Sequence, residues 1–423
     1  MGREELTMEA MIERFQKRLE WQEAHGRPHS KLIYTQCMMD YYTRVKEAQE
    51  QGKPLAITSI LFYPEILLSM GVVTFAAEQY AIQLIASGLG LDYIDKGEAY
   101  GFPKEGCSPQ KATIGLALEG ILPKPDFIVA TAQSPCDSSA VMIENLVHIY
   151  QSPIYFLNLP YRYDDAGMRA LKAELEDLIT FVEGQTGLKY DPEKLREFLN
   201  NSKEAHDYYL KAHALRARVP TPLGGRDSFS SFGIRMFSEG MPETVEFMKA
   251  YYEETLEKAE QGEGAVPNER FRVLVNGAYP FWDMPIFDWM EKEFGAVLVS
   301  DLHTRFLSTP VDTSGDPLEA LARKALISNM GARAFCAPYT ERSIELAERA
   351  KEYGCNASIY FANFGCKQGC GLIRVVSDAV REYLGVPTVI VEDDAGDPRI
   401  VSDAQMKATL AEYFKMLAAQ RST

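Results

Sequence analysis

Short runs of β-branched residues alternate with long amphipathic helical stretches along most of this chain. The runs are nearly continuous in apolar residues, which is typical of strands buried on both faces of a parallel sheet. They are expected at Leu55–Ile60, Phe127–Ala132 and Pro153–Asn158, and then at Arg272–Asn276, Ala296–Ser300, Arg333–Cys336, Ser358–Ala362 and Thr388–Val391. The pattern predicts an α/β fold with two doubly wound parallel-sheet domains.

Apolar residues at helical spacing fill the intervals between the expected strands. Covering helices are expected at Ala76–Gly88, Gln110–Gly120, Asp137–Tyr150, Met284–Phe294, Pro317–Met330, Glu341–Tyr353, Gly371–Leu384 and Asp403–Leu417. Most of the middle of the chain also has helical spacing, interrupted by the breaker-dense stretch Pro220–Arg226. We therefore divide the chain into N-terminal helices (1–51), a first α/β domain (52–163), a helical connector (164–265) and a second α/β domain (266–423).

Composition restricts the partners of the chain. Its 423 residues include 44 Lys or Arg and 60 Asp or Glu, which gives a net charge of −16. An acidic chain without a basic cluster is a poor match for nucleic acid, because phosphate binding requires concentrated positive charge. No apolar run reaches the ~18 residues of a membrane span, and the charged start lacks the apolar block of a signal peptide. We expect a cytoplasmic protein without nucleic-acid or membrane partners.

Cysteines are the candidates for chemistry, because several of them follow expected strands. Ligands of open parallel sheets bind at the carboxyl ends of the strands. Cys136 and Cys366 each follow a strand, Cys370 comes shortly after, Cys336 ends a short strand, and Cys107 precedes a helix in a loop with glycines. Soft thiolates that converge from separate loops suit an iron–sulfur cluster. Zinc is the weaker interpretation, since Cys366 and Cys370 have no second close pair.

Two other cysteines are expected to be buried in the core, where free Cys behaves as a small apolar residue. Cys37 lies within an N-terminal helical pattern, and Cys355 lies at the start of a strand. A strand of five or six residues would separate Cys355 from Cys366 by roughly 17 to 20 Å. The two thiols therefore do not easily share one cubane.

The cysteine loops resemble those of the 2-hydroxyacyl-CoA dehydratase and benzoyl-CoA reductase superfamily. The resemblance runs from about Leu55 to the end and rests on Cys107-Ser, Cys136-Asp, the post-strand Cys366 and the acidic stretch Glu392–Arg399. It implies two flavodoxin-like domains and a [4Fe–4S] cluster held by the same three cysteines. It also implies a separate ATP-hydrolysing iron–sulfur activator that supplies low-potential electrons.

Cys336 and Cys370 add two thiols to the three cysteines that a single cluster requires. In this respect the chain is most like the double-cubane-cluster branch, in which two joined [4Fe–4S] units take three cysteines each and the protein acts as an ATP-dependent reductase. The sixth ligand would be Cys37 or Cys355, and the sequence does not choose between them. The resemblance thus implies a low-potential iron–sulfur reductase of a small substrate.

Two alternatives to this reductase stay open. One is the single-cluster iron–sulfur subunit of a 2-hydroxyacyl-CoA dehydratase, which is a lyase, or of a benzoyl-CoA-type reductase. The other is a non-catalytic two-domain ligand-binding protein, because paired doubly wound domains also serve recognition.

The resemblance also implies a dimer, either a homodimer or a heterodimer with a related subunit. The sequence contains no P-loop pattern, so ATP would be hydrolysed by the activator rather than by this chain. Proton donors are not assigned. Glu105, Asp137 and Lys367 lie near the cysteines in sequence, but such residues are more often helix caps or solvated charges.

Overall fold

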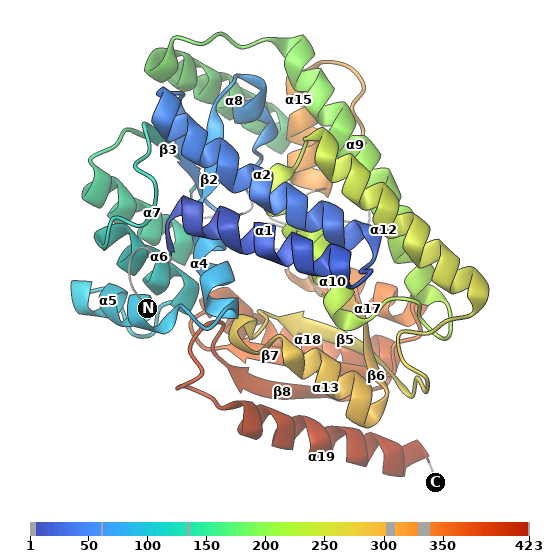
Figure 1. Cartoon of the computed structure of the whole chain (residues 1–423). Helices are drawn as coiled ribbons and strands as arrows, with labels where there is room; N and C mark the ends of the chain where they lie inside the picture. The colour runs from blue at the N-terminus through green and yellow to red at the C-terminus, as the bar shows by residue number, and fades with distance from the viewer. Residues whose placement is uncertain (1–5, 61, 133–135, 302–308, 329–338, 422–423) are drawn as a thin grey trace.

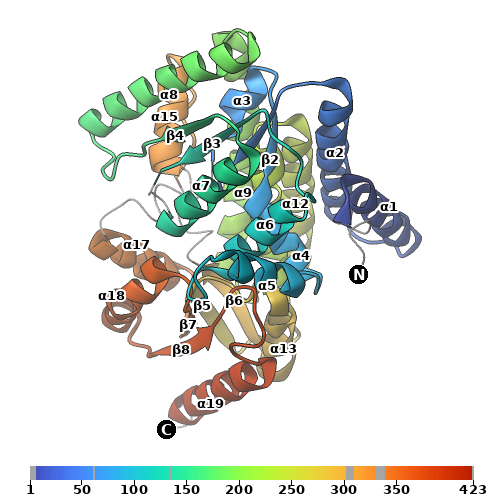
Figure 2. The ribbon, with the colours of Figure 1, turned by 90° about the vertical axis from the view of Figure 1, so that its left-hand side faces the viewer.

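The computed structural model describes residues 6–60, 62–132, 136–301, 309–328 and 339–421, and contains two parallel four-stranded sheets within them. The first sheet has the order β2-β1-β3-β4 and the second the order β6-β5-β7-β8, so the same topology occurs twice. Figures 1 and 2 place one sheet above the other, with helices around each. The strands are β1 Leu55–Thr58, β2 Val73–Ala76, β3 Phe127–Thr131, β4 Ile154–Leu157, β5 Phe271–Gly277, β6 Ala296–Asp301, β7 Ala357–Asn363 and β8 Thr388–Asp393. The predicted two-domain α/β class is confirmed.

Two details of the strand prediction differ from the structure. Strand β2 was not expected, because its four residues pass directly into a helix without a turn residue between them. All of β2 except Val73 is buried, which is what a strand inside the molecule requires. The strand expected at Arg333–Cys336 lies outside the described residues, and Cys336 with it.

Helices cover both faces of each sheet. One face of the first sheet packs against α1, α2 and α4 to α7, and the other against α3, α8, α9 and α15. The second sheet packs against α9, α12, α17 and α18 on one face, and against α13 and α19 on the other. Their bounds are α1 Met8–Ala24, α2 His29–Gln51, α3 Glu65–Ser69, α4 Ala77–Ala86, α5 Leu91–Tyr100, α6 Ser108–Leu118, α7 Asp137–Tyr150, α8 Asp165–Thr186, α9 Pro192–Ala214, α12 Pro242–Gln261, α13 Pro285–Phe294, α15 Pro317–Arg323, α17 Tyr339–Glu352, α18 Lys367–Leu384 and α19 Asp403–Arg421.

The expected boundaries at residues 51, 163 and 265 each fall between elements or at the end of one. Two segments nevertheless join the halves. Helix α2 contributes Cys37 to the core of the second sheet and Met38 to that of the first. Helix α15 and the π-helical turn η4, Lys324–Ser328, follow the second sheet's β6 in sequence but pack on the first sheet. The two halves therefore share packing through several elements.

The middle of the chain supplies short helical segments beside the two sheets. They are the 3-10 turn η2 Leu215–Ala217, the helices α10 Gly225–Gly233 and α11 Arg235–Ser238, and the 3-10 turn η3 Phe281–Asp283. Among the helices that the structure describes, none combines the length and the apolar composition that a bilayer span requires.

Candidate functional site

The three cysteines that the sequence brings together as ligands each precede a helix. Cys107 is the N-cap of α6, Cys136 that of α7 and Cys366 that of α18, and all three have extended backbone angles. Helix α18 begins at Lys367 rather than at the expected Gly371, because Cys366 caps it and its Sγ accepts a hydrogen bond of 3.2 Å from Gly369 N. A helix N-terminus carries partial positive charge and stabilises a thiolate.

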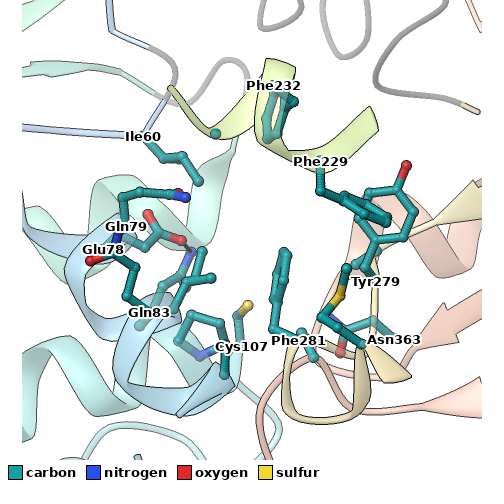
Figure 3. Close-up of a pocket in the computed structure, with 18 of the residues that line it drawn as sticks. Ile60, Glu78, Gln79, Gln83, Cys107, Phe229, Phe232, Tyr279, Phe281 and Asn363 are labelled. Carbon is teal, nitrogen blue, oxygen red and sulfur yellow. Dashed lines mark hydrogen bonds between the residues drawn. The ribbon is translucent and has the colours of Figure 1, made fainter. Parts of the chain in front are cut away.

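These cysteines line one cavity of about 310 Å³ between the two sheets. Its walls include residues that follow the central strands of both sheets: Ile60 after β1, Tyr279 after β5 and Asn363 at the end of β7. Figure 3 shows Cys107 between residues of the first half, such as Gln83, and residues of the second half, such as Phe281. The cavity thus lies where parallel α/β sheets usually bind ligands, at the switch points of their strand order.

Close backbone packing holds the cysteine loops against each other. A Cβ atom placed on Gly365 would lie 2.9 Å from both Cys107 Cα and Gly106 O, so only glycine fits there without movement. At the outer rim, Lys367 Nζ lies 3.5 Å from Asp137 Oδ2, which joins the starts of α18 and α7. The relative positions of the three thiols therefore depend on contacts between the two halves.

The acidic stretch after β8 is a scaffold for the cavity. Asp394 Oδ1 accepts hydrogen bonds of 2.8 Å from the backbone amides of Gly396 and Asp397, which closes a tight turn. Ala395 O accepts from Phe281 N at 3.0 Å and so fixes a residue of the cavity wall. Arg399 then pairs with Asp95 of the first half at 2.8 Å. This part of the motif positions residues rather than entering the cavity through its carboxylates.

Burial and nearby groups raise the pKa values of the three cavity thiols. Burial raises the pKa of Cys107 well above its usual value, that of Cys136 to about 12, and that of Cys366 as well. Glu78 and Cys366 raise the pKa values of Cys107 and Cys136 further, and the described cavity lining includes no Lys, Arg or His. Iron coordinated by sulfur deprotonates thiols and compensates their charge.

The three cavity thiols are the kind of soft donor that an iron–sulfur cluster takes. Within the described ranges, no three His, Cys, Asp or Glu side chains are close enough to hold one metal ion. In an iron–sulfur cubane each cysteine binds a different iron, so its ligands are spread around a cavity. Three soft thiols around a cavity of this size match that requirement.

Glu78 is a site residue that the sequence interpretation missed. It stands in the first turn of α4, directly after β2, and lines the cavity. Its Oε2 accepts a hydrogen bond of 3.0 Å from Ser139 Oγ, and the side-chain amide of Gln110 lies 3.3 Å from Oε1 and 3.6 Å from Cys136 Sγ. Burial raises the pKa of Glu78 to about 7. A carboxylate directly after an apolar run was the available signal.

The remaining candidates lie apart from the cavity wall. Cys370 donates from Sγ to Asn363 O at 3.2 Å and does not line the cavity. Cys37 and Cys355 are buried in the hydrophobic core beside the second sheet, as expected. Of the nearby charged residues named from the sequence, Glu105 is exposed, and Asp137 and Lys367 form the pair at the rim.

A family model described as 2-hydroxyglutaryl-CoA dehydratase, D-component, matches residues 60–417. Similar curated proteins include the (R)-phenyllactyl-CoA dehydratase alpha subunit of Clostridium sporogenes, which is 22% identical over 393 residues, 89% of this chain and 92% of the relative. One benzoyl-CoA reductase subunit of Thauera aromatica is 25% identical over 414 residues, 90% and 93% of the two chains. Another benzoyl-CoA reductase subunit of the same organism is 25% identical over 289 residues, 66% and 69% of the two chains.

These matches confirm the superfamily that the cysteine loops resemble. The relatives are named as subunits of dehydratases and of a reductase, and the alignments with two of them span most of both chains. Since the family model covers well over half of the residues, the chain belongs to the 2-hydroxyglutaryl-CoA dehydratase, D-component family.

Proposed function

We propose that this chain is the iron–sulfur subunit of an enzyme that dehydrates or reduces a coenzyme A thioester. Its cluster would be held by Cys107, Cys136 and Cys366, and a separate ATP-hydrolysing protein would supply the electrons. The observation that carries the proposal is that these three thiols, each at a helix N-terminus, line one cavity between two α/β domains. The names of the relatives supply the class of reaction and substrate.

The positions of the other three described cysteines support one cubane per chain. Cys370 is turned to a backbone carbonyl, and Cys37 and Cys355 are packed in the core. A double cubane, with the chain acting as a small-molecule reductase, is the second candidate. What favours it is the place of Cys370 in the first turn of α18, close enough to Cys366 to raise the pKa of that thiol.

The chain's own residues would prepare the cavity for chemistry. A bound iron–sulfur cluster would supply low-potential electrons and an iron site open to the substrate. The apolar walls exclude water, and the backbone amides of three helix starts stabilise negative charge at the cysteines. Glu78 would hold and release a proton near neutral pH, because burial brings the pKa of its carboxyl group to about 7.

Partner subunits follow from the same comparison. The relatives are named as alpha subunits of dehydratases or as different subunits of a benzoyl-CoA reductase, so each works in a larger assembly. This chain would pair with a second copy or with a related subunit. ATP hydrolysis would take place on the activator, since the sequence has no P-loop.

Iron and acid-labile sulfide analysis of protein prepared without oxygen tests the proposal. About four irons and four sulfides per chain support the single cluster. About eight irons per chain, with a lower iron content in Cys370→Ala, would favour the double cubane. A colourless, iron-free protein after anaerobic preparation and reconstitution would overturn the proposal and favour a non-catalytic binding protein.

A further inference from the structure

Aromatic side chains from the connector and from the second α/β domain form one wall of the cavity. Phe229 and Phe232 come from α10, while Tyr279 and Phe281 come from the segment after β5. Figure 3 shows the two α10 side chains at the upper side of the cavity and Cys107 at the lower side. The Phe229 and Tyr279 rings meet edge to face, with centroids 4.4 Å apart and planes at 90°. Such contacts hold the rings in fixed orientations.

Polar groups on this wall already form hydrogen bonds to other groups of the protein. The Tyr279 hydroxyl is hydrogen-bonded to Asp301, and Phe281 N donates to Ala395 O. The wall therefore presents mainly ring carbon to the cavity. A ligand group placed against it gains by burying apolar surface, and an aromatic group gains further from contacts with the rings.

Within the described part of the chain, the cavity lining offers an anionic ligand group no cationic partner. The described lining residues contribute neutral amides such as Gln79, Gln83 and Asn363, and the carboxyl group of Glu78, but no cationic side chain. A carboxylate that enters would lose its hydration without an ion pair and would face Glu78. The phosphate groups of a coenzyme A thioester would meet the same penalty and would stay outside this wall.

We infer that this wall receives the acyl group of the substrate, that this group is apolar and preferably aromatic, and that Phe229 and Phe232 on α10 select it. The inference rests on the proposed function, because the acyl group is that of a coenzyme A thioester.

Helix α10 is held over the cavity by contacts on its outer side. Gly225 N donates to Glu291 Oε1 at 2.6 Å, and Lys31 pairs with Asp227 at 2.9 Å. Phe229 also packs against Phe287, with ring centroids 5.4 Å apart. Phe232 is half-buried and lines the cavity, so we choose it for substitution.

The test compares the binding of two saturated thioesters, 3-phenylpropionyl-CoA and glutaryl-CoA, neither of which carries a hydroxyl group to eliminate. Titration calorimetry on the anaerobic, iron-loaded protein should show the phenylpropionyl thioester binding about tenfold or more tightly than the glutaryl thioester. Phe232→Leu should weaken phenylpropionyl binding severalfold and leave glutaryl binding unchanged. Phe232→Arg should narrow or reverse the preference, because it adds the missing cation.

Tyr161→Ala, at an exposed side chain outside the cavity, is the control and should change neither affinity. Equal or tighter binding of glutaryl-CoA to the parent protein would overturn this inference and leave the proposed function intact. Failure of both thioesters to bind would overturn the inference and the proposed function together. If Phe232→Leu retained its iron and both parent affinities, the selecting role of α10 would be wrong.

Discussion

Two groups of cysteines in this molecule share raised thiol pKa values but differ in place. Cys37 and Cys355 have pKa values raised to about 12 by burial, as does Cys136 in the cavity. Cys37 lies in the middle of α2 and donates to Glu243 O at 3.7 Å, and Cys355 precedes β7. The three cavity cysteines instead cap helices. A raised thiol pKa therefore does not distinguish the two groups, whereas position at the start of a helix beside a shared cavity does.

The largest expected difference between the two groups is in bound iron. Cys107→Ala should lose most of its iron and its brown colour, because a buried cluster ligand is removed without a replacement. Cys37→Ala should keep the full iron content and lose roughly 1 kcal/mol of unfolding free energy through weaker core packing. Iron analysis and denaturant unfolding under anaerobic conditions measure both quantities. Equal iron content in the two variants would remove the distinction between the groups.

Packing between the cysteine loops gives the next largest effect. In Gly365→Ala the new methyl group would meet the backbone of residues 106 and 107, so we expect a loss of about 1 to 3 kcal/mol in unfolding free energy and a lower iron content.

Gly371→Ala is the matched control, because it lies in α18 with no neighbouring atom within 4 Å of its added Cβ. Helix propensity predicts a neutral result or a gain of about 0.5 to 1 kcal/mol. If both alanine variants behaved alike, close approach of the loops would not be what positions the thiols.

The contact between α10 and Glu291 of α13 should make the stability of the protein depend on pH in a range where the core cysteines do not titrate. Burial raises the pKa of Glu291 from its usual 4.5 to about 7. Its folded-state pKa is above the unfolded one, so its contribution to stability is complete below pH 4.5 and is lost as pH rises toward 7. Glu291→Gln should remove a fall on the order of 1 to 2 kcal/mol over this range, measured by urea unfolding at several pH values.

Glu293→Gln is the control, because Glu293 is an exposed residue of α13, the helix that carries Glu291. This variant should have the same dependence of stability on pH as the parent protein. If the unfolding free energy of Glu291→Gln depended on pH as in the parent protein, this carboxyl group would not be the cause of the pH dependence.

The smallest expected effect concerns the ion pair that spans the two halves. Arg399→Ala removes the contact with Asp95 and a pair with Asp397, and should cost up to about 1 kcal/mol because the guanidinium is partly exposed. Arg374→Ala removes one exposed pair within α18 and should cost about 0.3 to 0.5 kcal/mol. Unfolding curves at low and high salt measure the contribution of each ion pair. An equal loss of unfolding free energy in the two variants would argue against a bridging role for Arg399.

The sequence predicted the fold well where local patterns were strong. Helix α7 was expected at Asp137–Tyr150 and has those bounds, because apolar residues recur at regular helical spacing through it. Strand β2 and the early start of α18 were missed, since a four-residue strand without turns and a glycine-containing first turn give weak local signals. Where local signals are weak, tertiary contacts determine which secondary structure a segment adopts.

The candidate site was predicted in part for the same reason. Strand ends located Cys136 and Cys366, and the cavity contains both together with Cys107. Glu78 was missed because it follows the unexpected β2. The wall from α10 could not be predicted, because the breaker-rich connector gives no indication that it folds back over the cysteines.

Anomalous scattering at the iron absorption edge, from crystals of the anaerobic protein, tests the central claim most directly. We predict one group of iron peaks in the interdomain cavity, bonded to the sulfur atoms of Cys107, Cys136 and Cys366. Iron peaks beside Cys37 or Cys355, or a cavity without iron in a protein that is otherwise iron-loaded, would contradict the account.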